Sequence, residues 1–402
     1  MIARHIMFWV AALVLGYTYV GYPLLIRVWA QFKGRPHDRK PMSPLVSLLV
    51  VAHNEAPRIR RRIENLLELD YAADRLEIVI ASDGSSDATV ALADTFRTAG
   101  VRVVAFDAHR GKPAVLNDVI PQLLGDIVVL TDVRQSIAKN AIRMLVDNFA
   151  DAGVGAVSGE LVLTGGEGRH DANVGTNVGA PEDSMHGTMD GVGFYWRYEK
   201  FIRRNESRVD STVGVTGALY ALRRELFEPI PTDTILDDVL VPMQIVRRGL
   251  RVLFESGALA HEPLSDNPTV EFRRKVRTIA GNFQLLAQHP WLLNPLANRL
   301  WLQTVSHKFF RLLCPAALVL LLIANLMLLE LLFYQTAFLL QVLFYSAALV
   351  AQLAPQVARK TALLSVPHAF CLLTWSTVAG FGRFIRGRQE VTWTRMTDPE
   401  PH

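Results

Sequence analysis

Residues 125–135 read GDIVVLTDVRQ, and the fold of the chain can be inferred outward from this stretch. The short apolar run at 127–130 is rich in β-branched residues, which is typical of a strand buried on both faces of a parallel sheet. Asp132 follows at the carboxyl end of that strand, where such sheets open their ligand crevice. Its carboxylate could face a metal ion or a sugar nucleotide, or it could serve only a turn or a helix cap.

Similar apolar runs precede and follow this strand, and segments with helical spacing separate most of them. Strands are expected at 46–51, 76–80, 101–106, 153–163 (as a pair or with a bulge), 213–222 and 251–255, and helices at 59–69, 88–99, 114–124, 139–149, 194–205, 237–248 and 273–286. Strands that alternate with helices at this spacing predict a doubly wound α/β sheet, largely parallel. The polar residues after each strand should then converge on one edge.

Long apolar segments lie at the two ends of the 402-residue chain, half of which is hydrophobic. The uncharged segment Ile6 to Ile26 has roughly the 20 residues that cross a bilayer. We interpret it as a retained anchor, with a cleaved signal peptide as the alternative. Three more spans are expected at about 312–330, 334–355 and 361–382.

The apolar segments predict an integral protein of a bacterial-type inner or plasma membrane. Basic residues after the first span place the middle of the chain on the cytoplasmic side by the positive-inside rule. They are Lys33, Arg35, Arg39, Lys40 and Arg60 to Arg62. Three later spans would put the tail outside, although its arginines favour the inside. Either the third segment is re-entrant or interfacial, or the number of spans differs. The expected division is an anchor (1–32), a catalytic domain (42–290), an interfacial segment (291–311), a membrane region (312–382) and a tail (383–402).

Charge and cysteine content exclude two classes of protein. The net charge is only +4, and no basic stripe with interleaved aromatic residues marks a nucleic-acid binder. The two cysteines, Cys314 and Cys371, lie in apolar segments and fit neither a disulfide framework nor a zinc site.

Carboxylates recur at the predicted strand ends: Glu55, Asp83, Asp132 and the pair Asp237–Asp238. Crowded carboxylates repel one another, so such a site favours a divalent cation or cationic groups. Oxygen ligands without cysteine favour Mg²⁺ or Mn²⁺, for which a nucleotide diphosphate is a natural companion. A carboxylate away from the metal could then act as a general base.

Six motifs in order resemble the membrane-bound family 2 glycosyltransferases, the branch with cellulose, chitin, hyaluronan and poly-N-acetylglucosamine synthases. They are VVAHNE (50–55), SDGSSD (82–87), GK…LND (111–118), LTDVRQ (130–135), TGALYALRRELF (216–227) and ILDD…RRG (235–249). The resemblance implies a GT-A fold with a mixed, mainly parallel sheet, flanked by membrane helices. It also implies an inverting transfer from a nucleotide sugar, expected to be UDP-linked.

The resemblance also implies roles for individual residues. Asp83 would contact the nucleotide base, Lys112 the diphosphate, and Asp132 would be the first aspartate of the DxD metal motif. Ala52, Asn54 and Glu55 would border the nucleotide, and Thr216 and Gly217 would form the acceptor-side turn. Asp238 would be the general base, in register with Gly249, whereas Asp237 is either catalytic or the N-cap of the following helix.

Two departures from the family pattern bear on metal and acceptor. Arg134 stands in the second DxD position. Metal binding would then rest on Asp132 and phosphate oxygens, or Arg134 would itself face the diphosphate. His261 is either an extra metal ligand or a structural residue. The acceptor signature QxxRW reads RKVRT here, which keeps Arg277 but has Arg274 and Thr278 for Gln and Trp. This basic helix could also lie on anionic lipid headgroups.

The preferred hypothesis is an inverting transferase that adds sugar from the donor to a membrane-associated glycan or polysaccharide. The alternatives are a non-processive transferase with a lipid-linked acceptor, and a degenerate nucleotide-sugar-binding module of a polysaccharide export assembly. A nucleotidyltransferase would need a glycine-rich loop where AHNE stands. Expected partners are the donor, the glycan or lipid-linked acceptor, membrane lipids and export subunits, but no nucleic acid.

Overall fold

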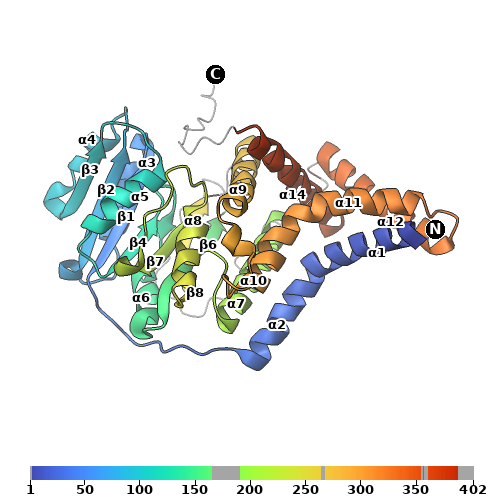
Figure 1. Cartoon of the computed structure of the whole chain (residues 1–402). Coiled ribbons are helices and arrows are strands. Elements are labelled where there is room, and N and C mark those ends of the chain that lie inside the picture. The colour runs from blue at the N-terminus through green and yellow to red at the C-terminus, as the bar shows by residue number, and fades with distance from the viewer. Residues whose placement is uncertain (1, 165–190, 264–267, 355, 357–360, 388–402) are drawn as a thin grey trace, which may run out of the picture.

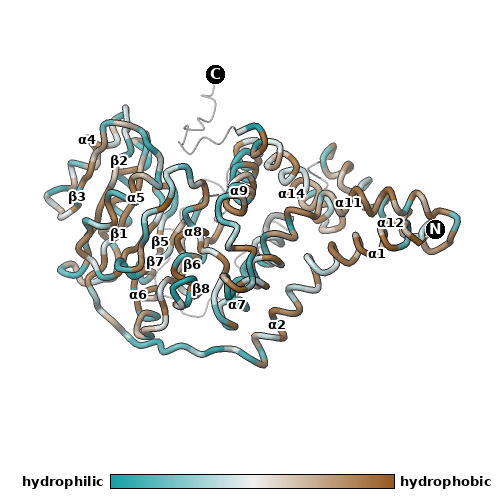
Figure 2. Tube along the Cα trace, in the orientation of Figure 1, coloured by the Kyte–Doolittle hydropathy of each residue, from teal (hydrophilic) through white to brown (hydrophobic). Residues whose placement is uncertain are grey.

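The computed structural model describes residues 2–164, 191–263, 268–354, 356 and 361–387. A sheet domain with helices on both faces occupies one side of the molecule, and long helices extend from it on the other (Figure 1). Figure 2 shows that the extended helices are largely hydrophobic along their length. The strands lie between residues 46 and 263, and the extended helices belong to the N-terminal segment and to the part of the chain after residue 300.

One mixed sheet of eight strands forms the centre of the domain, in the order β3-β2-β1-β4-β7-β6-β8-β5. The strands β1 to β4 are mutually parallel, whereas β7 runs antiparallel to both β4 and β6. Their bounds are β1 Val46–Ala52, β2 Leu76–Asp83, β3 Val101–Phe106, β4 Ile127–Thr131, β5 Ser136–Ile137, β6 Val154–Thr164, β7 Leu219–Arg223 and β8 Arg251–Pro263. The predicted α/β class and mixed, mainly parallel sheet are confirmed.

The pairing register brings the polar loops together. Val50 of β1 pairs with Ile80 of β2 and with Thr131 of β4, so the residues that follow these strands leave the sheet at the same edge. Alternate residues of β1 enter different cores, since Leu48 and Val50 face one layer of helices and Leu49 and Val51 the other. Burial on both faces explains the continuous apolar runs in the sequence.

Helices cover both faces of this sheet. They are α3 Ala56–Leu67, α4 Thr89–Asp94, α5 Lys112–Val119, α6 Ala141–Val146, α7 Gly191–Val209, α8 Asp237–Arg247 and α9 Pro268–Gln288. Asp87 accepts a hydrogen bond from the Thr89 amide at the start of α4, at 2.9 Å. Gly249 follows α8 with a φ of +91°, the left-handed conformation in which glycine commonly ends a helix.

Two strand predictions needed correction. The segment at 153–163 is a single strand with register shifts near Ala156 and Glu160, so the bulge and not the strand pair is present. The segment at 213–222 is strand only from Leu219, because the residues before it form the turn at Thr216. The two-residue strand β5 is too short to give a periodic signal.

Four helices among the described residues are long and apolar enough to cross a membrane, in agreement with the number of expected spans. They are Ile2–Lys33, Trp301–Leu326, Leu332–Leu353 and Ala362–Ile385. The first comprises α1 Ile2–Gly16, a π-helical turn Tyr17–Gly21 and α2 Tyr22–Lys33; the second comprises α10 Trp301–Gln303, a π-helical turn Thr304–Phe309 and α11 Phe310–Leu326; the others are α12 Leu332–Leu353 and α14 Ala362–Ile385.

The second apolar helix begins earlier than the sequence suggested. Its expected start was 312, after the basic residues, but the helix starts at Trp301 and includes His307 and Arg311. The His307 ring lies 2.9 Å from both Glu199 and Glu206 of α7, and Arg311 lies 2.7 Å from Glu199, so both side chains have partners inside the protein.

The last turns of α14 pack on α9 of the sheet domain. A Cβ on Gly380 would lie 2.7 Å from Ile279, and the ring of Phe381 lies 5.0 Å from that of Phe283. Arg383 and Arg386, near the end of the helix, therefore lie beside the domain. The rest of the predicted tail, from 388, lies outside the described residues.

Candidate active site

Lys112 joins two of the predicted carboxylates. Its ammonium lies 3.2 Å from Asp132, which follows β4, and 3.3 Å from Asp237, the first residue of α8. Only 8 % of the Lys112 residue is exposed. Burial opposes its charge, but the two carboxylates raise its pKa above the ordinary value. These residues and Asp238 are called the Lys112 cluster below.

Asp237 is not the helix cap that was considered as an alternative. The N-cap position of α8 is Leu236, and Asp237 is the first residue inside the helix. An acidic residue in the first turn is stabilised by the helix dipole as well as by Lys112. The structure therefore gives Asp237 a place in the cluster instead of a capping role.

Asp238 lies against the predicted acceptor-side turn. Its backbone oxygen accepts a hydrogen bond from Val215 at 2.8 Å, and a Cβ on Gly217 would lie 3.4 Å from its carboxylate. The glycine thus lets the turn pass close to this carboxylate. Burial and the Asp237 charge raise the pKa of Asp238 to about 6, against the opposing charges of Lys112, Lys308 and Arg203.

Two further side chains, Tyr220 and Arg277, also face the cluster. The sequence did not single out Tyr220, and it placed Arg277 only on the acceptor side. Tyr220 on β7 is fully buried, and its hydroxyl has no hydrogen-bond partner among the described residues. Burial and the Asp237 charge raise its pKa. Arg277 on α9, expected on the acceptor side, has its pKa lowered by burial, while the Asp237, Asp238 and Asp132 charges oppose this shift.

Asp83 organises the loop that leads into Lys112. Its carboxylate accepts hydrogen bonds from the amides of Arg110 and Gly111, both at 2.8 Å, and lies 2.9 Å from Nδ1 of His109. The residue is 2 % exposed. Its contact with a nucleotide base stays a prediction, and the structure adds that Asp83 holds the loop on which Lys112 begins α5.

The loop after β1 is folded against the loop after β2. Asn54 has a φ of +54°, and its side-chain oxygen accepts a hydrogen bond from the Ser86 amide at 2.8 Å. The Glu55 amide donates to Thr89 at 2.8 Å, and Ala52 pairs with Ser82 across the strands. The three residues predicted to border the nucleotide are therefore neighbours of Asp83, as the register requires.

Arg62, one of three consecutive arginines of α3, points into the protein and not toward solvent. The residue is 2 % exposed, and its guanidinium donates to Thr131 at 2.7 Å, directly before Asp132. Burial lowers its pKa to about 9, opposed by the charge of Asp132. The neighbouring Arg60 and Arg61 are exposed as expected. No motif distinguishes Arg62 from these two residues.

Two other arginines predicted near the donor or acceptor influence each other. Burial and the Arg134 charge lower the pKa of Arg274, on α9. Arg274 lies 3.3 Å from Glu262. Asp132 is the single carboxylate of the DVR sequence.

A divalent metal would find few protein ligands. No three His, Cys, Asp or Glu residues in the described part of the chain are grouped so that they could hold a metal ion. His261 lies on β8, opposite Ser136 of β5, and burial and the Lys200 charge lower its pKa. Asp132 offers one oxygen donor of the kind that Mg²⁺ and Mn²⁺ prefer.

Glutamates of α7 form a second group of buried charges. His307 lies 2.9 Å from both Glu199 and Glu206, and Arg311 lies 2.7 Å from Glu199. Burial opposes the charge of Glu199, but Arg311 and His307 hold its pKa well below the ordinary range. These four residues, called the membrane-side cluster, join α7 to the helix Trp301–Leu326. The sequence analysis did not predict this cluster.

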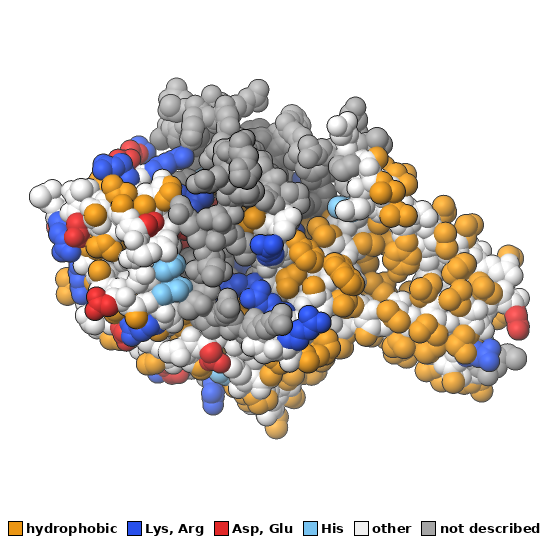
Figure 3. Space-filling view, turned by 90° about the horizontal axis from the view of Figure 1, so that it is seen from above, with side chains coloured by type: hydrophobic (Ala, Val, Ile, Leu, Met, Phe, Trp, Pro, Cys, Tyr) orange, Lys and Arg blue, Asp and Glu red, His pale blue; other side chains and the backbone are white. Residues whose placement is uncertain are grey.

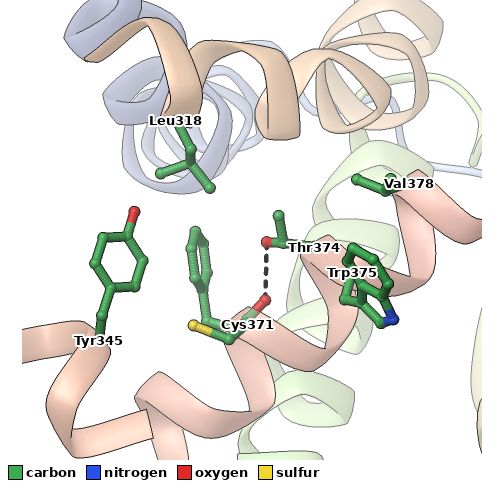
Figure 4. Close-up of a pocket in the computed structure, with 7 residues that line it drawn as sticks. Leu318, Tyr345, Cys371, Thr374, Trp375 and Val378 are labelled. Atoms are coloured by element: carbon green, nitrogen blue, oxygen red, sulfur yellow. Dashed lines mark hydrogen bonds between the residues drawn. The ribbon is translucent and has the colours of Figure 1, made fainter. Parts of the chain in front are cut away.

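Figure 3 shows hydrophobic side chains over the extended helices and basic side chains where the helices meet the sheet domain. A pocket with an empty volume of about 370 Å³ lies between the apolar helices α11, α12 and α14 (Figure 4). Its lining includes Leu318, Tyr345, Cys371 and Trp375, and it holds none of the predicted site residues. The pocket is therefore separate from the Lys112 cluster.

Residues 47–230 match the family model described as Glycosyl transferase family 2. The matched region includes Lys112, Asp132 and Asp83, and it ends before Asp237.

Several curated proteins are similar in sequence. A segment of 118 residues is 37 % identical to the beta-monoglucosyldiacylglycerol synthase of Synechocystis sp. and covers 28 % of this chain and 25 % of that protein. The probable glycosyltransferase YdaM of Bacillus subtilis is 24 % identical, and the poly-beta-1,6-N-acetyl-D-glucosamine synthase of Staphylococcus aureus is 23 % identical. Each of these two matches covers 60 % of this chain and 55 % of the relative.

Among solved structures, the mannosyltransferase PcManGT of Pyrobaculum calidifontis, in complex with GDP-Man and Mn²⁺, has a TM-score of 0.68. It is 21 % identical, and the match covers 95 % of this chain and 99 % of that one. The likeness extends over both the sheet domain and the apolar helices. The GT-A fold expected from the sequence is confirmed.

Proposed function

Residues 47–230 form a glycosyl transferase family 2 domain, and from this we propose that the chain is an inverting glycosyltransferase with a nucleotide-sugar donor. The acceptor is a membrane-associated glycan. One observation carries the proposal: the partly buried Asp238 carboxylate lies beside the Thr216–Gly217 turn and is influenced by the charge of Lys112, which contacts Asp132. A candidate base and a cation thus lie in one cluster.

The reaction is a single displacement at the anomeric carbon. The acceptor hydroxyl oxygen forms the new bond to that carbon and gives its proton to Asp238. The bond between the anomeric carbon and the diphosphate oxygen breaks, and the nucleoside diphosphate leaves with the electron pair. A carboxylate with a raised pKa is a suitable acceptor for this proton.

Lys112 and Arg277 provide positive charge for the leaving diphosphate. Lys112 is already held by Asp132 and Asp237, so little reorganisation is needed when the phosphates arrive. Asp83 contributes by fixing the loop before Lys112 and, in our proposal, by contacting the base. Asn54 and Glu55 lie on the neighbouring loop, and Arg134 lies beyond Asp132.

A divalent ion fits this site only with help from the donor. Asp132 would hold it, with phosphate oxygens as further ligands, and the ion would supply additional charge to the leaving group. The complex of PcManGT contains Mn²⁺, which is consistent with divalent metal use on this fold. We assign no ligand role to His261, which has no group of candidate ligands around it among the described residues.

The chain spans at most about half the length of the curated relatives named above. The donor and the acceptor of this chain are therefore proposals and are not taken over from these relatives. We propose a UDP-linked donor and a catalytic domain in the cytoplasm. Transfer to a lipid-linked acceptor without polymerisation is the second candidate, because the tryptophan of the acceptor signature is Thr278. Membrane lipids and polysaccharide export subunits are the further partners of this proposal.

The test is a transfer assay with the full chain in detergent and labelled UDP- and GDP-sugars, with and without Mn²⁺ and lipid acceptors. A ladder of product sizes supports polymerisation, and a single lipid-soluble product supports one transfer. Neither transfer nor hydrolysis of any donor would overturn the proposed enzyme and favour a degenerate nucleotide-sugar-binding module.

A further inference from the structure

A small pocket lies beside the turn that approaches Asp238. It is lined by Gly159, Glu160, Trp196, Lys200, Arg203 and Thr216, among others, and so lies between β6, α7 and the turn. Thr216 is held in place by Ser158, whose hydroxyl accepts from the Thr216 amide at 3.0 Å. An indole next to polar side chains is a suitable wall for a sugar ring, since it combines an apolar surface with hydrogen-bonding neighbours.

Two cations near this pocket are poorly compensated. The Arg203 guanidinium lies 3.6 Å from Glu199, too far for a hydrogen bond, and its buried Nε has no hydrogen-bond partner among the described residues. Lys308, on the π-helical turn at the start of the second apolar helix, is in no ion pair and no side-chain hydrogen bond with any residue that the structure describes. Both positive charges act on the Asp238 carboxylate.

The carboxylates near these two side chains are shared with other cations. Glu199, the ion-pair partner of Arg203, also binds His307 and Arg311. Glu160 lies 2.6 Å from Lys200, and the Asp238 carboxylate also faces the charge of Lys112. A partly buried cation without a close partner is costly, particularly where a chain enters a membrane, and such residues mark ligand sites. The missing partner is therefore an anion.

We propose that Arg203 and Lys308 bind a phosphate group of the acceptor, so that the acceptor is a lipid-linked sugar with phosphate between the sugar and the lipid. The inference rests on the proposed function, which it makes more specific. Lys308 lies near the start of a helix long enough to cross the membrane, where such a phosphate would be located. The pocket itself is too small to hold a sugar ring, so the sugar lies over its opening beside Trp196 and presents its hydroxyl toward Asp238.

Binding can be measured without knowledge of the donor. The probes are a farnesyl-length prenyl phosphate and the corresponding prenyl alcohol, each titrated against the full chain in neutral detergent by native mass spectrometry. We expect the wild type to bind the phosphate about tenfold or more tightly than the alcohol, the usual strength of charge-assisted hydrogen bonds. Lys308→Gln and Arg203→Gln should each lose most of this preference, and Lys308→Arg should retain it.

Lys33→Gln is the matched control, because this exposed lysine ends α2 and its loss changes the net charge equally. Equal binding of phosphate and alcohol by the wild type would overturn the inference, and so would an unchanged preference in Lys308→Gln. A loss of preference in Lys33→Gln as well would show a nonspecific charge effect and count against the site.

A transfer assay separates this inference from the proposed function. Wild type should use a prenyl-diphosphate-linked sugar with a KM about tenfold or more below that of the alkyl glycoside, and Lys308→Gln should raise the KM for the former alone. Preferred use of the neutral glycoside would overturn the phosphate assignment while the transferase proposal stands. If no donor is turned over, the transferase proposal fails, and the binding titration still decides the phosphate site.

Discussion

The Lys112 cluster and the membrane-side cluster both bury charged side chains, but they do so in different ways. In the first, one lysine lies between two carboxylates, while Asp238 and the Tyr220 hydroxyl have no close partner among the described residues. In the second, His307 and Arg311 engage both glutamates of α7 directly. The first cluster has capacity left for a ligand, whereas the second is largely satisfied by the chain itself. We therefore expect substitutions in the first to affect chemistry and those in the second to affect stability.

The largest effect is expected for Asp238→Asn. Loss of the base should lower transfer on the order of 10³-fold, within the range found for general-base removal. Donor binding, measured by titration calorimetry, should change little because the amide keeps the shape of the side chain. The control is Asp74→Asn, on an exposed turn. An equal loss of donor binding would show that Asp238 holds the donor instead.

Lys112→Gln should affect both ligand binding and folding. Without the ammonium, Asp132 and Asp237 would face each other unpaired, which costs about 3–5 kcal/mol for a broken buried ion pair. Denaturant unfolding in detergent should show this loss, and Mn²⁺ should restore part of it by occupying the space between the carboxylates. Lys139→Gln breaks an exposed pair with Glu68 and should have little effect. Full stability in Lys112→Gln would contradict the pairing.

Glu199→Gln should distinguish the second cluster from the first. His307 and Arg311 would lose a buried partner, and we expect about 2–3 kcal/mol less stability, since the amide oxygen retains some hydrogen bonding. Thermal unfolding measures this loss, and donor binding should stay as in the wild type. A protein with normal unfolding but weak donor binding would contradict the difference between the two clusters.

The smallest effect is a shift in pH dependence. Because burial and Asp237 raise the pKa of Asp238, its basic form is lost as the pH falls through about 6. An ordinary aspartate would titrate near 3.9. The kcat/KM should therefore fall about tenfold per unit below that point. A rate that stays constant down to pH 5 would exclude Asp238 as the base.

The Lys112 cluster was predictable from the sequence because its residues directly follow buried strands or begin helices. The strand run at 127–130 and the motifs around it predict that Asp132, Lys112 and Asp238 lie at one edge of the sheet. The membrane-side cluster was not predictable in this way. It combines two positions of α7 with residues of another helix roughly a hundred positions later, and polar residues at such distances leave no local pattern.

Arg62 and Arg311 show the same limit. Arg62 was grouped with the basic residues that follow the first span, and the second span was expected to start after Arg311, yet both side chains are buried or partly buried. A distant residue accepts a hydrogen bond from each: Thr131 from Arg62 and Glu199 from Arg311. Periodicity reports which face of a helix is apolar, but it does not report a charge that is paired inside the protein. This is why the predicted start of the second apolar helix lay too late in the chain.

The anomeric configuration of the newly formed glycoside tests the central claim most directly. Proton NMR of the product, recorded with the donor that the transfer assay identifies, gives the configuration through the coupling of the anomeric proton. A single displacement assisted by Asp238 predicts that it is inverted relative to the donor. A retained configuration would contradict the account, because it would require a second displacement or a front-side departure that this arrangement of base and cations does not provide.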